Sequence, residues 1–238
     1  MKVNSDVLQN VLRAFGSMGV LETTIKPSDG GWDMHAMDPS CVSITAAILK
    51  PAAFPDGSTL DKDVMISVPF LSDVLPKNKD CDISFDDSFV TVRYDRVKRA
   101  KRLIDPEDRP RPRPKLDDMS TCVLMSDDLI DIAKQSCFTS ITTDTGGVTV
   151  RMIETGLMFE SMSEVEAAQI GIDGTSVLEG DEEQVAVFPI KVILPLLKTL
   201  PKNTAVTVSM RTDVPIQLSI DEDTYSMDIY IAPLIKGD

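Results

Sequence analysis

The beginning of the chain carries apolar side chains at the spacing of an α-helix. The apolar positions are Val7, Leu8, Val11, Leu12 and Phe15. They fall on one face of a helix with about 3.6 residues per turn, and Gln9, Asn10 and Arg13 fall on the opposite face. Ser5 precedes them and is predicted to cap the helix, because a serine hydroxyl can accept hydrogen bonds from the free amides of a first turn.

A second amphipathic stretch begins at Ser126, which is predicted to cap a helix in the same way. Its apolar residues are Leu129, Ile130, Ile132 and Ala133, and its polar residues are Asp131, Lys134 and Gln135. Shorter helices are predicted at 68–75 and 190–199. Strand-like runs occupy Trp32–Met37, Cys41–Thr45, Ile83–Phe85 and Phe89–Arg93. Helices and strands in this mixture predict an α+β fold.

The chain repeats itself at a nearly constant offset. Leu75–Asn78 reads Leu-Pro-Lys-Asn and recurs as Leu200–Asn203. The first helical stretch recurs as well, because Ser5–Arg13 is similar to Ser126–Lys134. Matches that keep the same order along the chain indicate two related halves. We therefore expect two topologically similar domains of the βαβ type.

A proline-rich segment separates the two halves. Residues 104–118 contain Pro106, Pro110, Pro112 and Pro114. Prolines at this density favour an extended, exposed connection, since they fit neither a helix interior nor a central strand. The predicted organisation is an N-terminal domain at 1–103, a connecting loop at 104–118 and a C-terminal domain at 119–238.

The charge balance argues at first against a nucleic-acid partner. The chain has 38 acidic and 24 basic residues, a net charge of −14. The bases are concentrated, however, and the run from Arg93 to Lys115 is strongly positive. No apolar run is long enough to cross a membrane, and the first residues lack the apolar core of a signal peptide. These features predict a cytoplasmic protein that does not contact a membrane.

Candidate catalytic chemistry is sparse. Cys41, Cys81, Cys122 and Cys137 lack metal-site spacing and are expected to be buried thiols. The only histidine, His35, lies in a predicted strand and is expected to be structural. No motif brings together a nucleophile, a base and an orienting group. We expect no enzyme, no metal and no cofactor, although the many carboxylates leave open an acidic active site.

Several short motifs resemble those of archaeal sliding clamps, the proliferating cell nuclear antigen family. Ala36–Val42 reads Ala-Met-Asp-Pro-Ser-Cys-Val and is similar to a family segment that follows a strand. Tyr230–Ile235 resembles the closing family motif, and Asp213–Pro215 resembles the segment before the last strands. Arg102–Asp117 is similar to the family's interdomain connecting loop. The resemblance extends in order over the whole chain.

The resemblance implies a closed ring of three two-domain subunits, with helices lining a central hole and sheets on the outside. Such a ring encircles duplex DNA without reading its sequence and tethers DNA polymerase, which makes synthesis processive. The clamp loader, flap endonuclease and ligase bind the same ring through short peptide motifs. The family performs no chemistry itself and acts in replication and repair, here in the cytoplasm on the nucleoid.

The resemblance also assigns residues to three surfaces. The DNA-binding candidates on the inner surface are Arg13, Lys77, Lys79, Lys134, Lys198 and Lys202. Departures from the family pattern are Gln9, Asn10 and Asp131, which stand at positions that are often basic. The candidates for the subunit interface are Arg99, Lys101, Glu164 and Glu166.

The third surface is an apolar pocket for partner peptides. It is expected to consist of Met37, Val42, Leu116, Pro215, Tyr230, Ala232 and Pro233. Asp118 stands where the family usually has a second apolar residue of the loop.

Two further readings remain open. The chain could be a specialised clamp or one member of a heterotrimer, since the inner surface has lost basic residues. It could instead belong to another class, an acidic adaptor or an enzyme with a carboxylate site that never encircles DNA.

Overall fold

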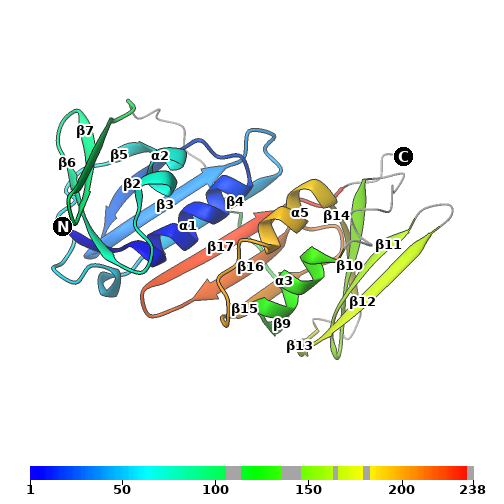
Figure 1. The fold of residues 1–238 in the computed structure, drawn as a ribbon. Coiled ribbons are helices and arrows are strands. Elements are labelled where there is room, and N and C mark those ends of the chain that lie inside the picture. Colours follow the sequence, from blue (N-terminus) through cyan, green and yellow to red (C-terminus); the bar gives the residue numbers. More distant parts are fainter. Residues whose placement is uncertain (106–113, 136–145, 163–165, 179–182, 235–238) are drawn as a thin grey trace. The chain divides into compact units, whose positions relative to one another are not determined.

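A computed structural model describes residues 1–105, 114–135, 146–162, 166–178 and 183–234 (Figure 1). The chain forms two compact units. The first contains Met1–Arg113 together with Asp221–Met227, and the second contains Pro114–Ile220 together with Asp228–Asp238.

The first unit begins with a strand and a helix, continues through four strands, and ends with a short helix and three strands. The elements are β1 (Lys2–Asn4), α1 (Ser5–Ser17), β2 (Glu22–Ser28), β3 (Gly31–Met37), β4 (Ser43–Leu49), η1 (Pro51–Ala53), β5 (Val64–Ser67), α2 (Val68–Val74), β6 (Asp80–Phe85), β7 (Phe89–Tyr94) and β8 (Val97–Arg102). β1, β6, β7 and β8 form one antiparallel sheet in that order, and β4, β3, β2 and β5 are paired in another.

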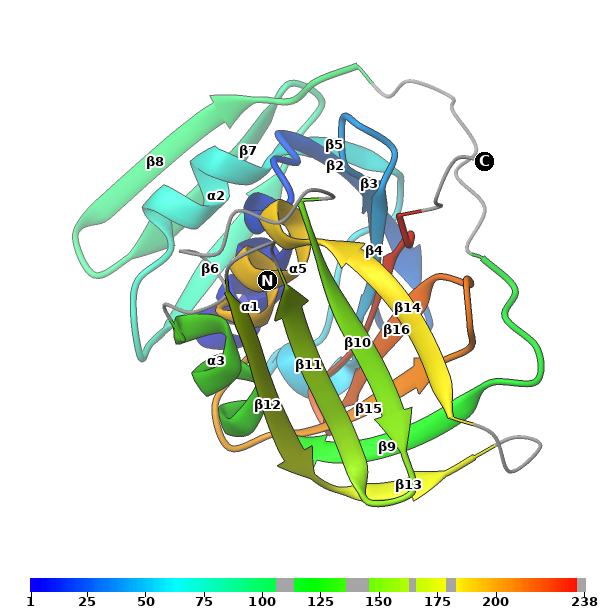
Figure 2. The same cartoon turned by 90° about the vertical axis from the view of Figure 1, so that its right-hand side faces the viewer.

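The second unit repeats this order of elements, with one additional short strand. Its elements are β9 (Ser120–Met125), α3 (Ser126–Lys134), β10 (Gly147–Ile153), β11 (Gly156–Met162), β12 (Ala167–Asp173), β13 (Thr175–Val177), β14 (Gln184–Pro189), α5 (Ile190–Leu197), β15 (Ala205–Met210), β16 (Ile216–Asp221) and β17 (Tyr225–Ile231). Figure 2 shows the sheet of β12, β11, β10 and β14 face on. The α+β fold and the duplication predicted from the sequence are thus confirmed.

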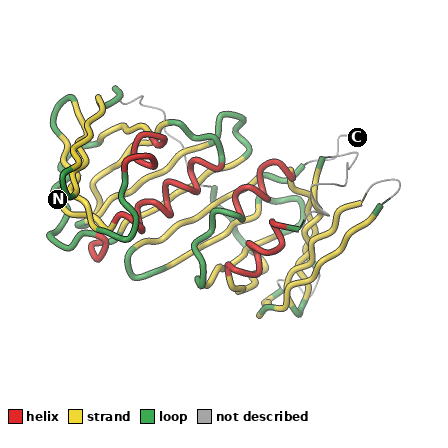
Figure 3. The backbone as a smooth tube through the Cα atoms, in the orientation of Figure 1, coloured by secondary structure: helices red, strands yellow, loops and turns green. Residues whose placement is uncertain are grey.

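In each unit two helices lie side by side and cover the apolar faces of the sheets (Figure 3). The apolar stripe of α1 is buried from Val7 to Phe15, as its spacing predicts. Gln9 differs from the prediction, because it is buried, and its amide oxygen accepts a hydrogen bond from Arg13 at 3.2 Å. A polar side chain that is buried in this way is normally hydrogen-bonded, and Arg13 supplies the donor.

The predicted helix caps are wrong at both sites. Asn4 caps α1 with its side-chain oxygen, and α3 has no side-chain cap. Ser5 and Ser126 are instead the first residues of their helices and are fully buried. Each hydroxyl bonds to the backbone of a distant turn, to Pro76 and Lys79 in the first unit and to Thr204 in the second. A buried serine with a backbone partner does not remain available as a cap.

The strand predicted to start at Cys41 begins two residues later, at Ser43. Cys41 has a left-handed backbone, φ 59°, in the turn that precedes β4, and its side chain is exposed. The expectation that all cysteines are buried is therefore wrong at this position. Cys81 and Cys122 are buried as predicted, and burial raises the pKa of Cys81 to about 12. Cys137 lies outside the described residues.

Candidate nucleic-acid interface and subunit surfaces

The basic candidates of the first unit lie on α1 and in the turn that follows α2. Arg13 is exposed on α1, and its guanidinium is anchored by Gln9. Lys77 is exposed in the turn. Lys79 Nζ lies 2.7 Å from Asp95, and this hydrogen bond, together with the attraction between the charges, raises the pKa of Lys79. A carboxylate this close offsets the charge that Lys79 could offer to a phosphate.

The second unit carries its three candidates at corresponding places. Lys134 ends α3, Lys198 follows α5 directly, and Lys202 lies in the next turn. Lys134 Nζ lies 2.8 Å from Asp131, the acid that replaces a base of the family pattern. Lys198 and Lys202 make no ion pair with any residue that the structure describes, and the same holds for Lys77. Among the six candidates, Lys77, Lys198 and Lys202 therefore have no acidic partner within the described residues, and Arg13 is held by the neutral side chain of Gln9.

The first predicted subunit surface is the edge strand β8. β8 ends the strand order of its sheet, and each of its residues is exposed. Arg99 lies opposite Val92, and Lys101 lies opposite Val90. Residues opposite each other in an antiparallel pair share a face, so both basic side chains lie on the face that carries the buried valines.

On this face the two bases contact α2. Arg99 lies 4.0 Å from the carboxylate of Asp73. Lys101 Nζ lies 3.1 Å from Ser67 Oγ and 5.8 Å from the centre of the Phe70 ring, in cation–π range. β8 and α2 thus form a basic surface around a half-buried aromatic ring, which we call the basic edge. Phe70 was not singled out from the sequence, because a phenylalanine in a helix first suggests core.

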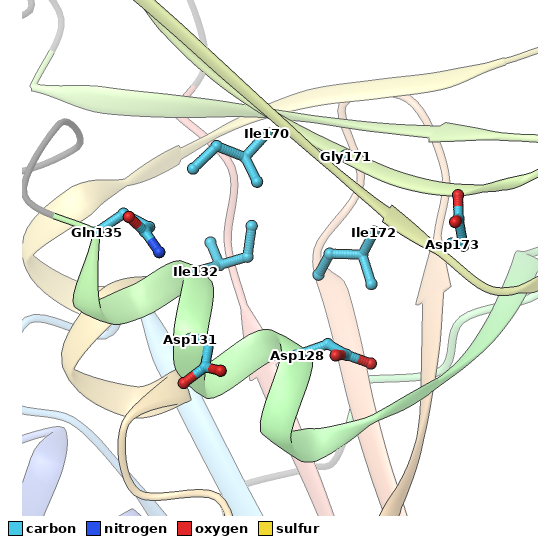
Figure 4. Close-up of a pocket in the computed structure, with 8 residues that line it drawn as sticks. All are labelled: Asp128, Asp131, Ile132, Gln135, Ile170, Gly171, Ile172 and Asp173. Atoms are coloured by element: carbon cyan, nitrogen blue, oxygen red, sulfur yellow. The ribbon is translucent and has the colours of Figure 1, made fainter.

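The second predicted subunit surface is the edge strand β12, at the end of the sheet shown in Figure 2. A groove of about 320 Å³ separates β12 from α3 (Figure 4). Ile132 of α3 faces Ile170 and Ile172 of β12 between the helix and the strand. The groove is bordered by acids, namely Asp128, Asp131 and Asp173. We call this groove, with its isoleucines and its acidic border, the acidic edge.

The resemblance assigned Glu164 and Glu166 to the subunit interface, on the strand that became β12. Glu166 is exposed and directly precedes β12, whereas Glu164 lies outside the described residues. The aspartates of the groove were missed as interface candidates. Asp128 and Asp131 lie four residues and one residue before Ile132, a predicted apolar position of α3. This spacing indicated that the acids lie near Ile132. It did not indicate an interface, because the position of β12 was not known from the sequence.

The residues of the predicted peptide pocket belong to both units. Met37 and Val42 lie at the two ends of the turn between β3 and β4, and both are half-buried. The candidates of the second unit are Leu116, Pro215, Tyr230, Ala232 and Pro233. Tyr230 of β17 is buried, and the other four are half-buried. Part of the connecting loop, residues 106–113, lies outside the described residues.

Asp38 organises the turn between Met37 and Val42 and was missed as a functional candidate. Its carboxylate accepts hydrogen bonds from the amides of Ser40, at 2.9 Å, and Ser43, at 2.5 Å, and from the Ser40 hydroxyl. Burial alone raises the pKa of Asp38, but these hydrogen bonds outweigh it, so the net pKa lies below the ordinary value. The ionised carboxylate therefore holds this turn in place at neutral pH.

Within the described residues, no group of three or more histidine, cysteine or acidic side chains could hold a metal ion. None of the described helices has the length and apolar character needed to span a bilayer.

Comparison with known proteins gives matches in structure only. No protein-family model and no curated protein matches the chain. A structure of the proliferating cell nuclear antigen of A. fulgidus, with the C-terminal region of FEN-1 bound, is similar at 18% identity and a TM-score of 0.85. The match covers 100% of this chain and 98% of that one. The corresponding antigen of Entamoeba histolytica matches at 19% identity and a TM-score of 0.83, over 98% of both chains. The chain therefore has the sliding-clamp fold over its full length, as its motifs predicted.

Proposed function

We propose that this protein is a sliding clamp, in which three copies close head to tail around duplex DNA and tether DNA polymerase and other replication and repair proteins. The observation that carries the proposal is the clamp fold over the full length of the chain, with both units present. A fold alone does not fix a function. Support from particular residues comes from the two edges and from the three lysines that make no ion pair with described residues.

Ring closure is supported by the different chemistry of the two edges. The basic edge offers Phe70 with Arg99 and Lys101, and the acidic edge offers a groove that contains isoleucines and is bordered by aspartates. A contact between two different surfaces is heterologous, and it produces a closed ring when the rotation between copies divides a full turn. Opposite charges favour this pairing and disfavour the contact of either edge with itself. A ring built in this way needs only one kind of chain.

DNA encirclement is supported by lysines that make no ion pair with the residues that the structure describes. Lys77, Lys198 and Lys202 are exposed, and each unit contributes at least one of them. Phosphates attract lysines without reading the base sequence. The pairing of Lys134 with Asp131 and of Lys79 with Asp95 leaves a moderate positive charge, which suits a ring that must slide.

Partner recruitment is proposed for the apolar residues around the connecting loop. Met37, Leu116 and Tyr230 would receive the apolar anchor and the aromatic side chains of a short peptide. The structure of the A. fulgidus protein with the C-terminal region of FEN-1 supports a flap endonuclease as one such partner. Polymerase, clamp loader and ligase are proposed to bind in the same way.

A topological retention assay tests the function. Protein loaded on a nicked circular plasmid by a clamp loader should remain bound in high salt, because a closed ring cannot leave a circle. Cutting the plasmid once with a restriction enzyme should release it. A protein that dissociates from circular and linear DNA at the same rate would instead be an ordinary DNA-binding protein or an adaptor.

A further inference from the structure

Each unit contains a clasp that joins the start of its long helix to a distant turn. In the first unit, Ser5 and Asp6 begin α1. The Ser5 hydroxyl donates to the carbonyl of Pro76 at 2.8 Å, and Asp6 Oδ1 accepts from the amide of Asn78 at 3.0 Å. These two bonds flank Lys77, whose side chain is exposed between them.

The second unit contains a related arrangement, in which the serine accepts instead of donating and both bonds follow the lysine in the chain. Ser126 and Asp127 begin α3. The Ser126 hydroxyl accepts from the amide of Thr204 at 3.1 Å, and Asp127 Oδ2 accepts from the amide of Asn203 at 2.6 Å. The exposed lysine of this turn is Lys202. We call residues 75–79 and 200–204 the lysine turns.

The two copies have the same residues at the turn and at the first two helix positions, and they differ at the third helix position. Both turns read Leu-Pro-Lys-Asn, and both helices begin with Ser-Asp. The next residue is Val7 in one helix and Asp128 in the other. Asn78 and Asn203 share a left-handed backbone, with φ of 54° and 55°. An asparagine tolerates this conformation better than most residues. The asparagine therefore favours the turn shape in which its amide donates to the aspartate of the helix.

We propose that Asp6 and Asp127 are positioning residues that hold the lysine turns in the conformation that presents Lys77 and Lys202 to DNA phosphates. This inference rests on the proposed function. A carboxylate beside a phosphate contact is unfavourable on charge alone. The hydrogen bond from the turn amide to this carboxylate offsets the unfavourable charge. A turn that is already ordered loses less conformational entropy when its lysine binds a phosphate.

Two substitutions of the same aspartates separate charge from positioning. Asp6→Asn/Asp127→Asn and Asp6→Ala/Asp127→Ala both remove two negative charges, but only asparagine keeps an acceptor for the turn amide. The affinity for a short linear duplex is measured by fluorescence anisotropy at low salt, with melting temperature and molar mass as checks of fold and assembly. We expect the Asn variant to bind at least as tightly as the unmodified protein. The Ala variant should bind about threefold to tenfold more weakly than the Asn variant.

A lysine-free background shows whether the aspartates act through the lysines. When Lys77→Ala/Lys202→Ala is combined with each aspartate pair, the difference between the Ala and Asn variants should disappear. If the paired Ala variant does not fold, the comparison is made in the second unit alone. Asp127→Ala is then compared with Asp127→Asn, each with and without Lys202→Ala.

Three outcomes would overturn the inference. Equal affinity of the Ala and Asn variants would assign the aspartates only a charge effect. A difference that persists without the lysines would make the clasp a general stabiliser of the fold. Release of the unmodified protein from circular and linear DNA at the same rate in the topological retention assay would overturn the proposed function itself, and is thus distinguished from a failure of the clasp alone.

Discussion

The basic edge and the acidic edge come from two units with the same order of elements, yet they have opposite character. The basic edge combines the last strand of the first unit, β8, with α2 and carries Arg99, Lys101 and Phe70. The acidic edge combines β12 with α3 and forms a groove that contains isoleucines and is bordered by carboxylates. The two edges are built from elements that do not correspond, because β8 and α2 match β17 and α5 in the repeated order, whereas β12 and α3 match β4 and α1. Complementary surfaces favour a head-to-tail ring, whereas identical ones would favour a two-fold dimer.

The largest effect is expected from reversing the charge of the acidic edge. In the proposed ring, Glu166→Lys/Asp173→Lys would place bases near Arg99 and Lys101, and like charges brought together cost several kcal/mol, which should weaken assembly at least about 100-fold. Analytical ultracentrifugation should then show single chains. Asp56→Lys/Asp223→Lys makes the same change of net charge at exposed turns and should leave assembly intact.

A compensating reversal tests the comparison directly. Arg99→Glu/Lys101→Glu in the same chain as the reversed acidic edge should restore the assembly, because every copy supplies both edges. Failure of the rescue, with both parent variants folded, would show that these residues do not face one another.

An intermediate effect is expected from Phe70→Ala. An aromatic anchor that packs against apolar side chains, here Ile132, Ile170 and Ile172, commonly contributes much of the binding energy, so the dissociation constant of the assembly should rise about 10-fold to 100-fold. Phe89→Ala is the matched control, since Phe89 is exposed and lies opposite Arg102, on the other face of the sheet. Equal effects of the two substitutions would contradict a specific role for Phe70.

The smallest effect is expected from Asp131→Asn. Loss of this charge releases Lys134, and the exposed ion pair itself contributes little to stability. DNA affinity should rise, and the slope of log affinity against log salt should steepen by about 0.9 for each added phosphate contact. Asp128→Asn removes the same charge from the same helix without releasing a lysine. An equal slope for both variants would mean that Lys134 does not reach the DNA.

The sequence predicted the elements and the duplication well, because apolar spacing and repeated motifs depend on local order. The stripe from Val7 to Phe15 and the strand Trp32–Met37 are formed as expected. The cap predictions failed for a different reason. Ser5 and Ser126 have the chemistry of a cap, but their partners lie more than 70 residues away in the chain.

The candidate surfaces were predictable only in part. The resemblance pointed to bases such as Lys134, but whether that lysine is compensated depends on the rotamer of Asp131, one turn away. The groove between α3 and β12 could not be predicted, because it requires Ile132 to face Ile170 across two elements. Asp38 was missed because an aspartate before a proline first suggests a turn, and its three hydrogen bonds appear only in the folded loop.

The molar mass of the unmodified protein tests the ring most directly. Size-exclusion chromatography with multi-angle light scattering, at several concentrations and moderate salt, should give about three times the 26.1 kDa of the chain. A mass of one chain at every concentration, or a mass of two chains, would contradict a ring closed by the basic and acidic edges.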